Sequence, residues 1–266
     1  MEETLTDNNY ISRKTLRKYN IAALILHTIQ GFLLLIASQM VTTIKDFNKE
    51  VTISYLDYDN TTRTLVSKTK NAFPIEIGLL ASIFILLSAF AHAFILIKWD
   101  KYLAYLEKEI NPYRWYEYAL SSSLMICGIA ILFGCYDLGS LILIFISNAC
   151  MNFFGLLMEM MNSPDKEKTN WLPFIFGCLS GAGSWIVVFL YFFASANFDL
   201  IPGFVYGILF GYIFFFNTFA INMFLQYSKI GRWKEYRYGE LVYIILSLLS
   251  KSLLGWLVFG GTFQPN

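Results

Sequence analysis

The sequence predicts an all-α membrane protein, a bundle of seven membrane-spanning helices, and three observations lead to this prediction. Only 15% of the 266 residues are charged, whereas a soluble domain keeps roughly a quarter of its residues charged. Phe and Tyr, with 25 and 17 copies, are abundant, as in proteins whose rings lie at lipid headgroups or line an apolar site. Seven apolar stretches each reach about 20 residues, the length at which a helix crosses a hydrocarbon core.

The seven stretches follow one another closely along the chain. They lie near residues 19–42, 75–98, 113–136, 138–160, 171–194, 201–228 and 238–260. The connections around Asp137, around Asp199 and from Met161 to Asn170 are short, and short connections make consecutive helices antiparallel neighbours. The whole chain, 1–266, is therefore expected to form one domain.

Basic residues are distributed unequally between the two sides of the predicted bundle. The side of the N-terminus carries 14 Lys and Arg residues, whereas the opposite side carries 5, all in the first long loop. Because Lys and Arg in short loops accumulate on the cytoplasmic side, the N-terminus is predicted to lie in the cytoplasm and the C-terminus outside. This orientation is the reverse of that of G-protein-coupled receptors.

The connection at residues 43–73 is much longer than the others. Residues 51–59 (VTISYLDYD) and 62–70 (TRTLVSKTK) are rich in β-branched and aromatic side chains, and DYDN at 57–60 supplies turn-forming residues between them. We therefore predict an extracellular β-hairpin in this loop.

Charge and cysteine usage exclude several function classes. A net charge of +1 gives no basic face for nucleic acid. The four cysteines lie inside apolar stretches, without a CxxC pair or His at zinc-like spacing, and are expected to be packed thiols rather than disulfides or metal ligands. They are Cys127, Cys135, Cys150 and Cys178. We expect neither a metal site nor an enzyme.

Lys251 is the most unusual residue because it lies deep inside the seventh stretch. About 13 residues at 1.5 Å each place it roughly 20 Å from the cytoplasmic boundary, beyond easy reach of either surface. A Lys at that depth costs roughly 2.5–3.5 kcal/mol to insert. There are two explanations for a Lys at this position. The first is packing or a static ion pair. The second is amine chemistry, because a desolvated Lys readily forms Schiff bases.

Further residues lie on the same predicted face of the seventh helix as Lys251. Glu240 and Ser247 precede Lys251 by eleven and four residues, which are near-integral numbers of helical turns. Gly255, one turn after Lys251, leaves space for a bulky group, and Trp256 follows it. We expect this face to point into the bundle.

A protonated Lys251 needs an anion, and Glu117 at the start of the third stretch is the best candidate. Pro112 suits the first turn of that helix, and Arg114 lies three residues before Glu117 on the same face. An Arg114–Glu117 pair at the membrane interface is the alternative, because counting residues leaves Glu117 several ångströms short of Lys251. In that case Glu159 or Glu240 supplies the anion.

Polar residues also recur at helical spacing in other stretches. Asn20, His27, Gln30 and Ser38 share a face of the first stretch, and Asn148, Asn152 and Glu159 share a face of the fourth. Together with His92 they are either satisfied core groups or a proton-accepting network. Gly203, Gly207 and Gly211 form a small-residue ridge that suits close helix packing, within or between subunits.

At these residues the chain resembles the heliorhodopsins, seven-helix retinal proteins whose orientation is inverted relative to ordinary microbial rhodopsins. The segments that carry the resemblance are RWYEYALSSSLM at 114–125, SLLSKSLLGW at 247–256 and HTIQG at 27–31. The resemblance extends over essentially the whole chain and includes the long first loop.

The resemblance implies roles for particular residues. Lys251 would bind all-trans retinal as a protonated Schiff base with Glu117 as counterion; Ser247 and Ser121 would line this region, and Trp256 would pack in the chromophore pocket. A polar, water-containing cavity on the cytoplasmic side would be formed by His27, His92, Gln30, Asn20, Asn148, Glu240 and Arg114, and Arg114 would tune Glu117.

The resemblance also implies a homodimer with the first-loop hairpin near the contact, a slow photocycle and an unknown cytoplasmic signalling partner. Two functions follow from it. The first is a light receptor. The second is a light-driven or light-gated proton transporter that uses Glu117, Glu159, Glu240, Asp199 and the histidines. A non-retinal membrane protein is a third possibility. The mostly apolar extracellular half of the bundle favours the receptor.

Overall fold

The computed structural model describes residues 11–162, 164–165, 167–194, 201 and 203–261. Seven helices in these residues are long and apolar enough to cross a membrane. They are α1 (Arg13–Met40), α3 (Ile77–Ile97), α5 (Pro112–Leu132), α6 (Leu138–Met161), α7 (Leu172–Phe193), α8 (Gly203–Tyr227) and α9 (Tyr236–Gly261). The predicted seven-helix membrane fold is confirmed; the predicted connection around Asp199 lies outside the described residues.

The helices begin where the sequence provides capping groups. Ser12 accepts a hydrogen bond from the backbone N–H of Thr15 (3.0 Å), and α1 follows it. Asn111 caps α5, and Asp137 accepts a hydrogen bond from the N–H of Ser140 (2.9 Å) at the start of α6. These side chains satisfy N–H groups that have no partner within the helix.

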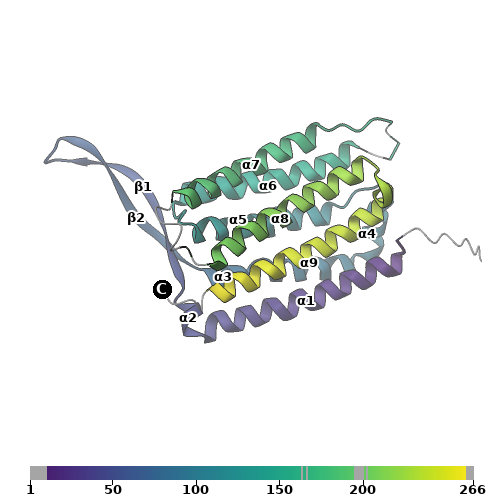
Figure 1. The fold of residues 1–266 in the computed structure, drawn as a ribbon, viewed down its shortest axis with the longest axis horizontal. Coiled ribbons are helices and arrows are strands. Elements are labelled where there is room, and N and C mark those ends of the chain that lie inside the picture. Colours follow the sequence, from purple (N-terminus) through teal and green to yellow (C-terminus); the bar gives the residue numbers. More distant parts are fainter. Residues whose placement is uncertain (1–10, 163, 166, 195–200, 202, 262–266) are drawn as a thin grey trace, which may run out of the picture.

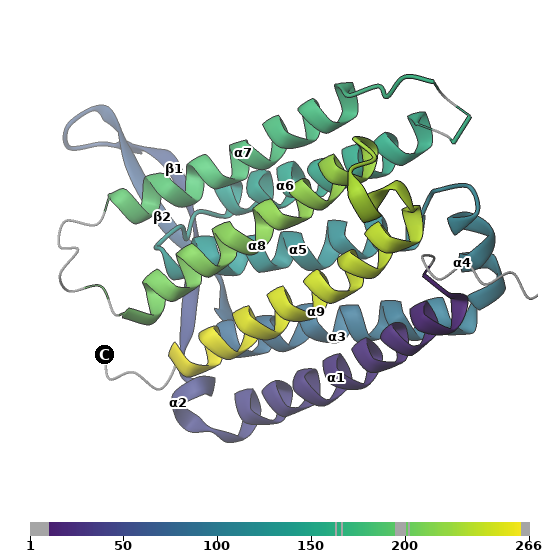
Figure 2. The same ribbon diagram turned by 45° about the vertical axis from the view of Figure 1, so that its right-hand side comes forward.

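The helices lie side by side with their axes roughly aligned (Figures 1 and 2). Around the bundle, α1 contacts α3, α3 contacts α5, α5 contacts α6, and α6 contacts α7; α8 contacts α9, which returns to α1 and α3. Gly207 and Gly211 of α8 face Leu257 and Leu253 of α9, so at these two positions the small-residue ridge packs inside the subunit.

The long first loop forms the predicted hairpin. Strands β1 (Asn48–Asp59) and β2 (Thr64–Glu76) pair antiparallel and project from one end of the bundle (Figure 1). The hairpin begins after a short helix, α2 (Thr42–Lys45), and the N–H of Thr52 donates to the carbonyl of Tyr136 (2.8 Å) between α5 and α6. Both strands extend beyond the predicted ranges.

The opposite end of the bundle carries α4 (Trp99–Leu106), a short helix that the sequence analysis did not predict (Figure 1). A 3-10 helix, η2 (Gly231–Lys234), joins α8 to α9. Tyr102, Leu103 and Leu106 of α4 are buried against the bundle. In the following text the two ends are called the α4 end and the hairpin end.

Apolar side chains cover the outside of the bundle, whereas much of its polar content is inside. Ile29, Leu143 and Leu179 are exposed on three different helices, as expected for surfaces that face lipid.

Of the four cysteines, Cys135 is buried and Cys127 is half-buried, but Cys150 and Cys178 are exposed. The prediction of packed thiols is therefore wrong for the last two.

Candidate functional site

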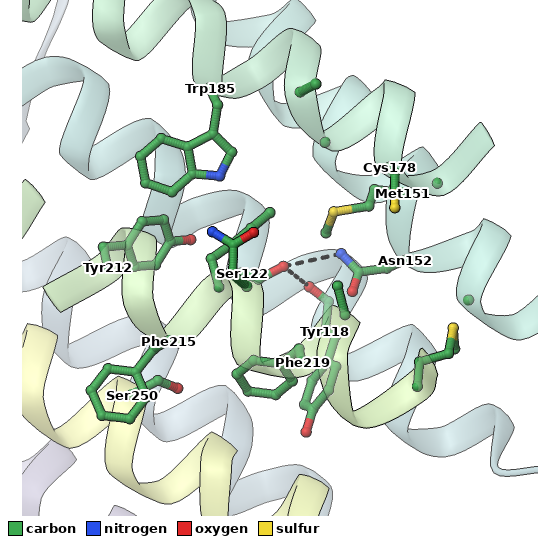
Figure 3. A pocket seen from close by; sticks show the side chains of 18 of the residues that line it. Tyr118, Ser122, Met151, Asn152, Cys178, Trp185, Tyr212, Phe215, Phe219 and Ser250 are labelled. Atoms are coloured by element: carbon green, nitrogen blue, oxygen red, sulfur yellow. Dashed lines mark hydrogen bonds between the residues drawn. The ribbon is translucent and has the colours of Figure 1, made fainter. Parts of the chain in front are cut away.

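A cavity of about 360 Å³ lies inside the bundle between α5, α6, α7, α8 and α9, and Lys251 forms part of its wall. Most of the wall is aromatic or apolar, with a few polar groups such as Ser122, Asn152 and Ser250 (Figure 3). Its aromatic residues include Trp115, Tyr118, Trp185, Tyr212, Phe216, Phe219 and Tyr243. A wall of this composition suits a flat, apolar ligand.

The amine of Lys251 forms an ion pair with Glu117. Its Nζ lies 2.5 Å from Oε1 of Glu117, and the two side chains are only 3% and 10% exposed. Ser88 of α3 completes the group, because its hydroxyl accepts from Lys251 (2.5 Å) and donates to the same carboxylate oxygen (2.6 Å). A buried pair of this kind depends on both partners, since either charge left alone would be strongly disfavoured.

Tyr118 covers the ion pair on one side. The ammonium of Lys251 lies 5.1 Å from the centre of the Tyr118 ring, within the range of a cation–π contact. The phenol of Tyr118 donates to the backbone carbonyl of Tyr243 (3.1 Å) and so links α5 to α9. The ring is therefore held where it borders both the cavity and Lys251.

Arg114 does not pair with Glu117. Its guanidinium binds the carboxylates of Glu159 on α6 and Glu240 on α9. Tyr236 donates to Glu159 (2.9 Å), and Tyr102 of α4 donates to Glu240 (2.9 Å). The Arg114–Glu117 alternative is therefore wrong, and the two other candidate anions for Lys251 are already bound to Arg114 at the α4 end.

The two histidines lie together between Lys251 and the α4 end. Their rings stack with centroids 5.7 Å apart, and Nδ1 of His92 hydrogen bonds to Oδ1 of Asn20 (2.8 Å). Both ring nitrogens of His27 lack a hydrogen-bond partner among the described residues. Gln30 is half-buried and accepts from Ser252 (2.7 Å), next to Lys251 in the sequence.

None of the predicted polar-cavity residues borders the 360 Å³ cavity; Arg114 pairs with Glu240 at the α4 end, and His92 hydrogen bonds to Asn20 beside His27. Asn148 belongs to a third group, in which its amide donates to Ser122 (2.8 Å) and Ser123 (3.0 Å) of α5. Periodicity along single helices could not distinguish these groups, because their members come from different helices.

The three remaining predicted residues differ in position. Ser121 and Ser247 are buried, one helical turn from Glu117 and Lys251 respectively. Trp256, in contrast, does not line the cavity and is 42% exposed. The predicted placement of Trp256 in a pocket is therefore corrected: its neighbour Gly255 faces Ile85 and Leu34 inside the bundle, and one residue along a helix turns the side chain by about 100°.

Ser88 and most of the aromatic wall were not predicted from the sequence. Ser88 precedes His92 by four residues on α3, so the shared helical face was a usable signal. The wall residues Trp185 and Tyr212 gave no such signal, because aromatic residues are frequent throughout the chain and only tertiary packing selects those that surround a cavity.

Comparison with known proteins agrees with this arrangement. A family model described as heliorhodopsin matches residues 16–263. No curated protein matches the chain significantly. Heliorhodopsins are retinal-binding, light-sensing membrane proteins that are generally not classed as enzymes, and the seven apolar helices make this chain an integral multi-pass membrane protein. Because the match covers nearly its entire length, the chain belongs to the heliorhodopsin family.

Proposed function

We propose that this protein is a light receptor in which Lys251 binds all-trans retinal covalently as a protonated Schiff base, with Glu117 as the counterion. The observation that carries the proposal is the buried Lys251–Glu117 pair, 2.5 Å between Nζ and Oε1, at the wall of an aromatic cavity. Retinal supplies an aldehyde that condenses with a primary amine and a conjugated chain that absorbs visible light and isomerises.

The residues around Lys251 fit such a ligand. A volume of about 360 Å³ falls within the range of small-molecule sites, roughly 300–1,000 Å³. Gly181 on α7 lines this space, and an added Cβ there would lie 2.7 Å from the sulfur of Met151, which also lines it. The lysine amine is the attachment point at the cavity wall, and the surrounding rings exclude water from it.

Glu117 and Ser88 control the charge at the attachment nitrogen. The carboxylate stabilises a positive nitrogen, and the hydroxyl of Ser88 fixes the carboxylate through a 2.6 Å hydrogen bond. Ser121 and Ser247, one turn away, complete the surroundings. Glu159 and Glu240 are less suited to this role because Arg114 binds both.

We further propose that light changes the charge balance at Lys251 and that the α4 end responds. After Glu117, which lies 2.5 Å from the nitrogen, the stacked pair His27–His92 is a further candidate to accept a proton. His92 hydrogen bonds to Asn20 on the side of the bundle that holds the Arg114 cluster, the buried group of Arg114, Glu159 and Glu240. Loss of the Lys251–Glu117 attraction would then alter packing in a part of the bundle rich in buried charge. This proposal includes a slow photocycle, a cytoplasmic signalling partner and the all-trans geometry of the bound retinal.

The distribution of buried charge supports a receptor over a transporter. Among the described residues, the buried acidic, basic and histidine side chains are Lys251, its nearly buried partner Glu117, and residues on the α4 side of Lys251: His27, His92, Arg114, Glu159 and Glu240. The core toward the hairpin end is apolar, with Ile85, Ile208 and Val258 among its members. A transporter needs a polar path to both surfaces.

A homodimer is also part of the proposal. Tyr55, Leu56 and Tyr58 of β1 are exposed on the hairpin, and apolar side chains of this kind suit a contact with a second copy.

The direct test is to express the chain, add all-trans retinal and record the visible spectrum. We expect a coloured pigment that hydroxylamine bleaches, because hydroxylamine cleaves an imine bond. A protein that folds but remains colourless would contradict the proposal. For the choice between receptor and transporter, light-induced pH changes in pigment-containing vesicles are expected to be absent, and a sustained flux would favour transport.

A further inference from the structure

Two neighbouring hydrogen-bond donors of the cavity wall, one on α7 and one on α8, lack a partner in the part of the chain that the structure describes. Trp185 of α7 and Tyr212 of α8 are 9% and 5% exposed, and their ring centroids lie 5.3 Å apart. The indole Nε1 of Trp185 and the phenol oxygen of Tyr212 lack a hydrogen-bond partner among the described residues. Figure 3 shows both polar atoms on the cavity side of their rings, facing the same space. Buried donors are rarely left unpaired, so a partner is expected.

The surrounding wall offers mainly hydrocarbon. The Trp185 ring contacts Phe189 and Phe216, each at 5.5 Å between centroids, and the Tyr212 ring contacts Phe216 at 5.7 Å. An indole N–H can only donate, and a phenol donates readily. A group that satisfies both donors must therefore carry an acceptor oxygen. We expect the molecule that occupies the cavity to supply this oxygen.

Retinal itself would not supply that oxygen, a conclusion that rests on the proposed function. When the aldehyde condenses with the amine of Lys251, the carbon–oxygen double bond is replaced by a carbon–nitrogen double bond and the oxygen leaves as water. Retinal has no other oxygen. The attached chain is a hydrocarbon, and it would leave both donors without an acceptor.

We propose that the cavity is selective for retinoids that carry a second oxygen, a ketone or hydroxyl in addition to the aldehyde, and that Trp185 and Tyr212 bind this oxygen. The aldehyde still condenses with Lys251 in the same way. The added oxygen accepts from the indole and the phenol and removes the cost of two unpaired buried donors. The two residues are specificity determinants, separate from the attachment site.

The test is a competition in the full-length apoprotein. Equal amounts of all-trans retinal and all-trans 4-oxoretinal, and in a parallel sample all-trans retinal and all-trans 3-hydroxyretinal, are offered, and the chromophores released from the washed pigment are quantified by mass spectrometry. We expect at least one oxygenated compound to be enriched on the order of fivefold, the ratio that one net hydrogen bond gives. Because each sample supplies its own ratio, a variant that folds poorly still reports the preference.

Three variants test which residues cause the preference for an oxygenated retinoid. Tyr212→Phe and Trp185→Phe each remove one donor and keep an aromatic ring, so each is expected to lower the enrichment. Trp256→Phe is the matched control: it makes the same change of side chain, but Trp256 does not line the cavity and is 42% exposed. This control is expected to keep the enrichment of the wild type.

Two results would overturn the inference. Equal uptake of all compounds by the wild-type protein would show that the donors find another partner, such as a bound water, and would leave the proposed function intact. An enrichment that persists in both Tyr212→Phe and Trp185→Phe would assign it to other residues. Attachment of none of the compounds would contradict the inference and the proposed function together.

Discussion

At the scale of single residues, Lys251 and Glu117 meet because of the direction in which the lysine side chain leaves its helix. The burial of Lys251 followed from its depth in an apolar stretch. The short distance between Lys251 and Glu117 could not be predicted in this way, because counting residues along a helix ignores the direction of the side chains. A helical side chain points back toward the N-terminus of its helix, and for α9 that is the α4 end, where Glu117 lies. The two groups therefore meet at 2.5 Å.

A comparison of three substitutions tests the counterion. Glu117→Gln removes the carboxylate next to Lys251 and is expected to shift the absorption maximum strongly, to the red if the nitrogen stays protonated and to the ultraviolet if it does not. Glu159→Gln and Glu240→Gln alter carboxylates that Arg114 binds and are expected to shift it much less. Spectra of the three pigments, recorded across pH, provide the measurement. An unchanged Glu117→Gln spectrum beside a large shift in another variant would reassign the counterion.

The Arg114 cluster could not have been predicted from one sequence. Arg114 and Glu117 are three residues apart on one helix, and that spacing suggested a local pair. The actual partners lie 45 and 126 residues away, on α6 and α9. Three buried charges from three helices come together only when the bundle closes, so their pairing is tertiary information.

At the scale of elements, helix length and turn chemistry were sufficient for most of the fold. Apolar length gave all seven membrane helices; the largest boundary difference is at α1, which begins at Arg13 rather than near residue 19. The hairpin followed from β-branched residues around a turn. The short helix α4 was missed because its three buried residues, Tyr102, Leu103 and Leu106, are too few to form a recognisable apolar stretch.

The packing of α5 on α6 can be tested at Gly155. An added Cβ at this position would overlap the indole of Trp115, and overpacking of a core costs roughly 1–3 kcal/mol. Gly155→Ala is therefore expected to lower the unfolding temperature of the purified protein in detergent. Gly207→Ala is the control, because the same methyl group on α8 would make an ordinary contact with Leu257 at 3.7 Å.

The test is decided by the change in unfolding temperature of Gly155→Ala compared with that of Gly207→Ala. Replacing Gly by Ala inside a helix stabilises it by up to about 1 kcal/mol when the space is free, so Gly207→Ala is expected to be neutral or stabilising. If Gly155→Ala were equally stable, the close contact between Trp115 and α6 would not be a feature of the folded protein.

At the scale of the whole molecule, the direction of insertion is a prediction from charge. The side of the N-terminus carries 14 basic residues against 5 on the other side, which predicts a cytoplasmic N-terminus and an external C-terminus. Epitope tags fused to each end and probed with antibody in intact cells provide the measurement. Labelling of the N-terminal tag without permeabilisation would refute this orientation, whereas labelling of the C-terminal tag alone is the expected result.

The central claim for the whole molecule is that it is a pigment attached through Lys251. The most direct measurement is mass spectrometry of peptides from the retinal-treated protein after the imine has been reduced with borohydride. The retinyl group is predicted on the peptide that contains Lys251, and Lys251→Ala is predicted to carry no covalent chromophore. A retinyl group on any other lysine, or a covalent visible pigment in Lys251→Ala, would contradict the account.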